Sequence, residues 1–105
     1  MKLKFKKNHI TFKLSKAEKK ELSHVGQSLK ETLIFPGNHS LTYILSLTSN
    51  ESAKCSFINN EITLHLPWNQ FELLSTPSKQ GISFDFESLS VSVEVDLLPR
   101  IKHAI

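Results

Sequence analysis

The sequence of 105 residues has little of several residue types, and each shortage excludes a class of protein. Its single cysteine, Cys55, excludes an intrachain disulfide framework and a cysteine-rich zinc site. Its three glycines, Gly26, Gly37 and Gly81, are too scattered for a P-loop or a dinucleotide-binding fingerprint. No apolar run is long enough to span a membrane, and the first residues alternate lysine with apolar residues instead of forming a signal peptide. We therefore expect a cytoplasmic protein without a membrane partner.

The overall composition is that of a folded domain. Hydrophobic residues make up 39% of the chain and charged residues 22%, which is typical of globular proteins and not of disordered ones. A chain of this length is enough for one domain with its own core. We predict a single domain over residues 1–99, followed by a frayed tail over residues 100–105.

The most informative pattern is a β-hairpin that turns at Asn59-Asn60. Asparagine tolerates the positive φ angles that a two-residue type I′ turn requires. This turn pairs Phe57 with Ile62 and Cys55 with Leu64, and the intervening pairs are mostly polar. The alternation predicts one buried face and one wet face, with Cys55 as a packed thiol on the buried side.

Two more hairpins lie at the ends of the chain. With turns at Lys7-Asn8 and Glu87-Ser88, apolar residues again meet across each pair of strands. The outward face of the first hairpin is basic and that of the last is acidic, so we predict that the two hairpins lie side by side. Substituting lysines of the first hairpin by glutamate should then destabilise the protein more than the same change at Lys54.

Between these hairpins the sequence predicts one helix and two further strands. Ser15 and Glu18 have the spacing of a capping box, which opens a helix from Lys16 to about Val25 with Gly26 after it. Strands follow over residues 29–35 and 41–47. The parity of the second strand brings Leu45 to Cys55.

Taken together, these patterns predict an α+β fold that is mainly an antiparallel β meander of about seven strands. One α-helix lies between the second and third strands, and the sheet is either curled or an open barrel. Pro67 ends a strand because it cannot donate to a ladder. Residues 68–74 then form one or two helical turns that close the end of the core.

The order of these features resembles a small uncharacterised bacterial protein family of similar length. Its members begin with a basic alternating hairpin, continue with a capped helix that ends at glycine, and later carry a Leu-Thr-Tyr-x-Leu strand. The counterparts in this sequence span most of the chain: Lys7-Asn8, Leu14-Ser15 through Glu18 to Gly26, Phe35-Pro36-Gly37, Leu41 to Leu45, Gln80-Gly81-Ile82 and Val93 to Leu97. The departures are Val95 and Leu97, where the family tends to Lys and Phe, and Lys19, where it tends to an apolar residue.

The resemblance implies one domain and this strand order. It carries no site residues, because the family has no established activity.

No arrangement of residues in the sequence indicates catalysis. The five histidines, His9, His24, His39, His65 and His103, are not spaced as local metal-ligand pairs. No serine lies in a nucleophile elbow, and the carboxylate pairs alternate on exposed strands. We predict no enzymatic activity and no cofactor, while a site assembled only in space stays open.

The strongest candidate site is a row of lysines. Lys2, Lys4, Lys6 and Lys13 share one face of the first hairpin and could follow a phosphate backbone or hold another anion. The alternative is that these lysines are solvated charge that protects an outer strand from aggregation. Trp68 is a second candidate, as a contact for a partner or a pocket, although closing the core is the more common role of such a residue.

We therefore expect a small non-catalytic binding domain that contacts a protein partner or associates with itself through a sheet edge. The alternative is an anion-binding module for nucleic acid or a phosphorylated ligand, which would use the N-terminal lysines. Retention on heparin that falls with salt would separate the two.

Overall fold

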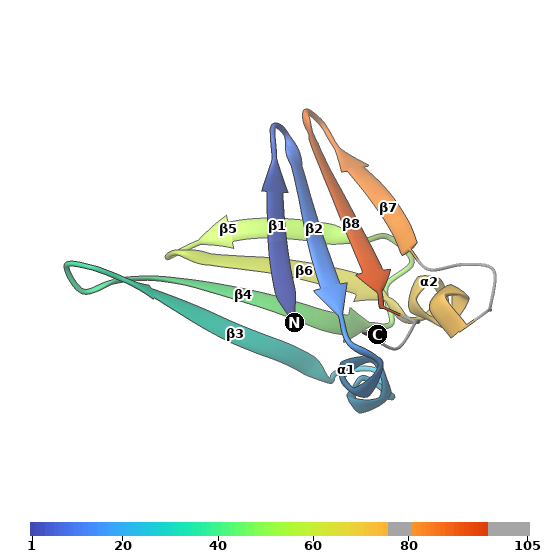
Figure 1. Cartoon of the computed structure of the whole chain (residues 1–105). Coiled ribbons are helices and arrows are strands. Elements are labelled where there is room, and N and C mark those ends of the chain that lie inside the picture. Colours follow the sequence, from blue (N-terminus) through green and yellow to red (C-terminus); the bar gives the residue numbers. More distant parts are fainter. Residues whose placement is uncertain (76–80, 97–105) are drawn as a thin grey trace, which may run out of the picture.

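The computed structural model describes residues 1–75 and 81–96, which form eight strands in two four-stranded sheets (Figure 1). The terminal sheet has the order β1-β2-β8-β7, from Lys2–Lys6, His9–Leu14, Leu89–Val95 and Gly81–Phe86. The central sheet has the order β3-β4-β6-β5, from Ser28–Phe35, His39–Thr48, Glu61–Pro67 and Lys54–Ile58. The single domain over residues 1–99 stays a prediction, and the tail over residues 100–105 lies outside the described residues.

Both sheets are built in the same way, from two antiparallel hairpins joined through their second strands. β2 pairs with β8 in parallel in the terminal sheet, and β4 pairs with β6 in parallel in the central sheet. The predicted antiparallel meander, with its curled sheet or open barrel, is therefore wrong: both sheets are mixed, and neither is closed or curled. Instead of the predicted seven or so strands, the described residues form eight. The protein is a mainly β structure with short helices.

The registers of the predicted hairpins are confirmed. Phe57 lies opposite Ile62 and Cys55 opposite Leu64, and the turn residues Asn59 and Asn60 have φ angles of 52° and 63°. Phe5 lies opposite Ile10 in the first hairpin, and the last hairpin also has its predicted register. One neighbour was predicted wrongly. Leu45 lies opposite Leu64 and not opposite Cys55, because β6 and not β5 is the neighbour of β4.

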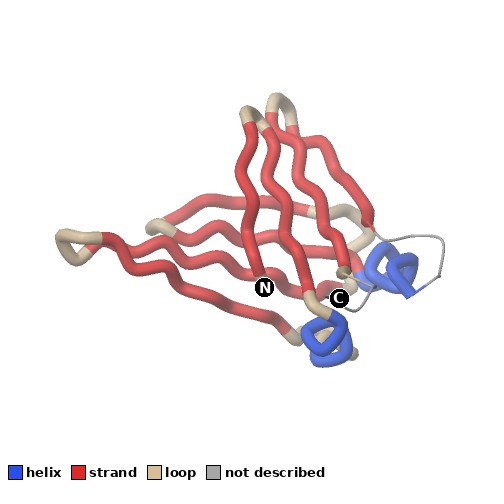
Figure 2. Tube along the Cα trace, viewed as in Figure 1, coloured by secondary structure: helices blue, strands red, loops and turns tan. Residues whose placement is uncertain are grey.

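The two sheets pack face to face with their strands running across one another (Figure 2). We call the face of each sheet that carries buried apolar residues its inner face. The inner faces share one core, to which the terminal sheet contributes Phe12, Val91 and Val93 and the central sheet Leu45, Leu64 and Leu66. The ends of the sheets that carry the hairpin turns point in different directions, and the molecule measures 40 × 39 × 26 Å along its principal axes.

Short helices lie at the end where the sheets meet (Figure 1). α1 (Lys16–Glu21) has the predicted capping box, but it ends earlier than Val25. The reason lies in Gln27, whose side-chain oxygen accepts from the backbone N–H groups of Ser23 and His24. α2 (Trp68–Phe71) and a 3₁₀ turn (Glu72–Ser75) follow β6, in which Pro67 is the last residue, as predicted. No helix in residues 1–75 or 81–96 has the length and apolar character to cross a bilayer.

The alternation in β5 predicts the correct face but not the burial of its residues. Ile62 is buried, whereas Phe57, opposite it on the same inner face, is 66% exposed. The predicted burial of Phe57 is therefore wrong. β5 is an edge strand, so Phe57 has a neighbouring strand on one side only. Cys55, two residues earlier, is half-buried.

Candidate functional site

The four predicted lysines lie on one face of the terminal sheet. β1 carries Lys2, Lys4 and Lys6 at every second position, and Lys13 of β2 lies opposite Lys2. Because neighbouring residues of a strand point to opposite faces, these side chains lie on the outer face, away from Leu3 and Phe12. The three lysines of β1 are exposed, and Lys13 is half-buried. We call this set the lysine face; its role as an anion site stays a prediction.

Acidic residues lie beside the lysine face. The β2–β8 pairing, which confirms that the two terminal hairpins are neighbours, sets Lys13 opposite Glu94. In the register, Lys13 therefore lies between Lys2 on β1 and Glu94 on β8. The opposite charge on β8 offsets the repulsion between the two lysines.

The outer face is hollowed at the junction of β1, β2 and β8. A hollow of about 270 Å³ is lined by Lys4, Lys6, His9, Thr11, Ser92 and Glu94. His9 Nε2 lies 2.9 Å from Ser92 Oγ, and Ser92 Oγ lies 2.8 Å from Ser83 Oγ. Sequence reasoning predicted the lysines here but missed His9 and Ser92. These residues are 83 positions apart, and only the pairing of β2 with β8 brings them together.

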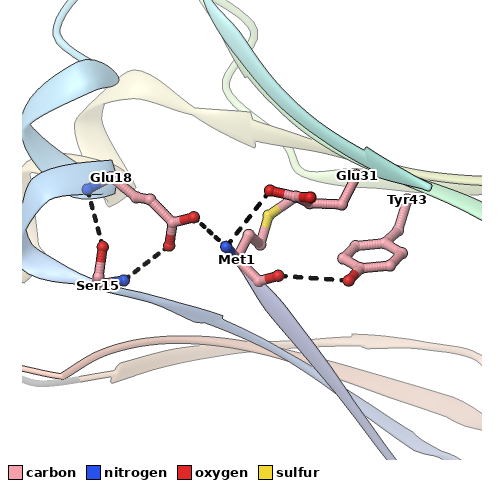
Figure 3. A network of polar contacts seen from close by, with 5 residues as sticks. All are labelled: Met1, Ser15, Glu18, Glu31 and Tyr43. Atoms are coloured by element: carbon pink, nitrogen blue, oxygen red, sulfur yellow. Dashed lines mark hydrogen bonds and ion pairs between the residues drawn. The ribbon is translucent and has the colours of Figure 1, made fainter. Parts of the chain in front are cut away.

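A polar network holds the first residue of the chain between the two sheets (Figure 3). The Met1 α-ammonium forms an ion pair with Glu18 and lies 3.7 Å from Glu31 on β3. Glu18 also accepts from the Ser15 backbone N–H at 2.9 Å, which completes the capping box. The Tyr43 hydroxyl donates to the Met1 carbonyl at 3.3 Å. The network therefore joins β1, α1 and the central sheet.

The environment of this network shifts two pKa values. Partial burial acts to raise the pKa of the Glu18 carboxyl, but hydrogen bonds from the Met1 ammonium and Ser15 outweigh it and hold the pKa below its ordinary value. Burial, followed by the negative charges of Glu31 and Glu18, raises the pKa of the Tyr43 phenol. Glu18 is thus ionised and Tyr43 protonated at neutral pH, as their hydrogen bonds require.

Trp68 lies beside the core and at the edge of a second hollow. Its ring is half-buried and packs against Phe71, with ring centroids 5.8 Å apart. Phe71 and Leu74 are buried, as expected for residues that close the end of the core. The hollow, of about 250 Å³, is lined by Val25, Ser49, Asn50, Glu51, Trp68 and Asn69. A contact of Trp68 with a partner or pocket ligand stays a prediction.

Large apolar side chains are exposed along three edge strands. β3 exposes Leu33, Ile34 and Phe35, β5 exposes Phe57 and Ile58, and β1 exposes Phe5. The β3–β4 ladder continues to Phe35 opposite His39, while the β4–β6 ladder begins only at Thr42. The hairpin therefore extends beyond β6 as a two-stranded ribbon (Figure 1). Sequence reasoning placed apolar residues there but did not predict their exposure.

Neither a cluster of metal ligands nor a reactive thiol is evident in the part of the chain that the structure describes. Residues 1–75 and 81–96 contain no group of three or more His, Cys, Asp and Glu side chains that could hold a metal ion. Burial raises the pKa of the Cys55 thiol, which disfavours the reactive thiolate. His103 lies outside the described residues.

A comparison with protein-family models identifies the family of this chain. Residues 1–98 match the model of a family of unknown function, DUF7009. The chain belongs to DUF7009. This membership confirms the predicted resemblance to a family without an established activity. No curated protein and no solved structure matches the chain.

Membership in DUF7009 assigns no role to any residue of this chain. The proposals for the function of this DUF7009 protein therefore depend on two surfaces. These are the exposed apolar edge of the central sheet and the lysine face with its hollow.

Proposed function

We propose that this protein is a non-catalytic interaction domain that associates with a second copy of itself through the β3 edge of the central sheet. The observation that carries the proposal is the exposure of three consecutive apolar side chains on this edge: 51% for Leu33, 72% for Ile34 and 44% for Phe35. Large apolar side chains that are exposed together, and not singly, are typical of interaction sites.

The β3 edge suits the addition of another strand. β3 has eight residues and is the longest edge strand in the described part of the chain. Its last four residues, Thr32 to Phe35, carry no charge. The β1 edge differs, because Lys2, Lys4 and Lys6 guard it against pairing with another chain. An uncharged, apolar edge strand is the usual template for strand addition between proteins.

A two-fold pair of β3 strands would use the apolar residues on both faces of the sheet. Leu33 and Phe35 lie on the inner face, while Ile34 lies on the outer face. Each of these partly exposed side chains would contribute about 1 kcal/mol on burial, or about 6 kcal/mol for two copies. Association itself costs on the order of 4–15 kcal/mol, so the new backbone hydrogen bonds must supply the rest. We therefore expect a weak dimer in equilibrium with its monomer, and not an obligate dimer.

The mass of the protein in solution, measured over a range of concentrations, tests this proposal. We expect a shift from monomer to dimer as the concentration rises. Ile34→Lys places a charge on the β3 edge and should leave the protein monomeric at every concentration. Ile58→Lys is the matched control, because Ile58 is an equally apolar, 64% exposed residue on the β5 edge; this variant should still form dimers.

Two results would overturn the proposal. A wild-type protein that stays monomeric at all concentrations excludes self-association and leaves only a foreign protein as partner. If Ile58→Lys abolishes the dimer and Ile34→Lys does not, the interface lies on β5 and not on β3.

A second candidate function is anion binding by the lysine face in the cytoplasm. It is supported by the register that sets Lys2, Lys4 and Lys6 on one outer face, with Lys13 beside them. Retention on heparin that falls steeply with salt is the expected result. Replacing Lys4 and Lys6 by glutamine should abolish retention, whereas Lys30→Gln and Lys54→Gln, on the central sheet, should not. A protein that passes through heparin at low salt has no such function.

A further inference from the structure

The hollow at the junction of β1, β2 and β8 differs from the rest of the lysine face in its chemistry. The register places Thr11 between Lys4 and Ser92, and His9 between Lys6 and Ser90. Two ammonium groups, an imidazole and two hydroxyls therefore converge on one volume of about 270 Å³. The two ammonium groups and the Thr11 hydroxyl are donors of the kind that proteins use for the oxygens of a phosphate group, while His9 and Ser92 hydrogen-bond each other.

Hydrogen bonds fix the hydroxyl side of this hollow. Ser92 is 5% exposed, and its hydroxyl lies within 2.9 Å of both His9 Nε2 and Ser83 Oγ. Thr11, the other hydroxyl, is also nearly buried. A site whose donors are already held in place loses less conformational entropy when a ligand binds. Lys4 and Lys6 add the positive charge of this hollow.

We propose that this hollow binds the phosphate group of a small, hydroxyl-bearing ligand of the sugar-phosphate class. This inference goes beyond the dimer and depends on the second candidate function only for the charge of Lys4 and Lys6. The site assigned here also includes His9, Thr11, Ser92 and Glu94, none of which the lysine face contains.

The charges around the hollow favour a compact ligand over a nucleic acid. Asp85, Glu94 and Asp96 lie on β7 and at β8, next to the basic part of the sheet. A polyanion that continued across the sheet would meet Asp85 and Asp96 as well as Glu94, whereas one phosphate group beside Lys4 and Lys6 would meet only Glu94. Glu94, at the rim, can accept a hydrogen bond from a hydroxyl of the same ligand.

Isothermal titration of the wild-type chain with glucose 6-phosphate, inorganic phosphate and glucose tests the site. We expect glucose 6-phosphate to bind in the millimolar range or tighter, inorganic phosphate more weakly, and glucose not at all. Lys6→Gln should weaken the binding of glucose 6-phosphate about fivefold to tenfold, since it removes one charged donor. Lys54→Gln, on the outer face of the central sheet, should leave it unchanged.

Glu94→Gln provides a second, independent measurement. Removing this carboxylate should strengthen the binding of inorganic phosphate, because it removes a negative charge from the rim of the hollow. Thermal unfolding of each variant confirms that it is folded. The proposal is overturned if glucose 6-phosphate does not bind, or if Lys54→Gln weakens binding as much as Lys6→Gln. Binding of single-stranded DNA alone, dependent on Lys4 and Lys6, also overturns it and leaves the anion-binding function of the lysine face in place.

Discussion

The ion pair between the Met1 ammonium and Glu18 gives the sharpest prediction for stability. Glu18→Gln keeps a side-chain oxygen at the third position of α1, so the capping box can still form. The variant loses only the charge that faces the ammonium. Hydrogen bonds to charged groups contribute about 1 kcal/mol more than neutral ones, so we expect a loss of about 1 kcal/mol.

Glu18→Ala should cost about twice as much. It removes the charge and also the acceptor of the Ser15 backbone N–H, and the loss of a helix cap costs about 1 kcal/mol. For a domain of this size, each kcal/mol corresponds to about 4–8 °C in Tm. Urea unfolding at neutral pH, followed by the fluorescence of the single tryptophan, Trp68, measures both variants. Glu21→Gln, an exposed change in the same helix, is the control and should have little effect.

The pH dependence of this difference has a definite sign. The folded state holds the pKa of Glu18 below its ordinary value, so folding favours the ionised carboxylate. The stabilisation is complete above the pKa that Glu18 has in the unfolded chain, and it is lost as the pH falls through the lower, folded pKa. The gap between wild type and Glu18→Gln should therefore close in acid. Equal stability of the two proteins at neutral pH, or a gap that widens in acid, would refute the reasoning.

Three further predictions concern the sheets and their turns. Lys13→Glu should destabilise the protein by up to about 1 kcal/mol more than Lys54→Glu, because Lys13 faces Glu94 on β8; equal losses in urea unfolding would contradict the paired charges. Phe12→Ala should cost about 3–5 kcal/mol, since the ring is fully buried, whereas Phe57→Ala should cost less than about 1 kcal/mol in the monomer; calorimetry distinguishes the two. Glu87→Gly should raise Tm, because Glu87 has a φ of 56° that glycine adopts without strain and glutamate does not; a lower Tm would show that the Glu87 side chain matters more than its backbone.

The local parts of the fold follow from the sequence. Asn59 and Asn60 indicate a tight turn because of their tolerance of positive φ, and the alternation on either side then sets the register of β5 and β6. The same reasoning places Lys2, Lys4 and Lys6 on one face. These inferences need only the geometry of a strand and of its turn, which neighbouring residues determine.

The parallel pairings could not be predicted in the same way. Alternation shows which face of β4 is apolar, but it does not distinguish β5 from β6 as its neighbour, since both strands alternate equally well. The exposure of Phe57 could not be predicted either, because the sequence does not show how far one sheet covers the other. The contact of His9 with Ser92 required the β2–β8 pairing and was therefore missed.

The order of the strands along the chain also determines when each sheet can form. The central sheet uses one continuous segment, residues 28–67, whereas the terminal sheet needs β1 and β2 from before it and β7 and β8 from after it. During synthesis, the central sheet can complete its hydrogen bonds while the first hairpin still lacks its neighbour. Closing so long a loop makes the β2–β8 pairing slow, so arrival of the C-terminal hairpin should be the late step of folding. Until then Phe12 has no Val93 beside it, and the nascent protein is at its most prone to aggregate.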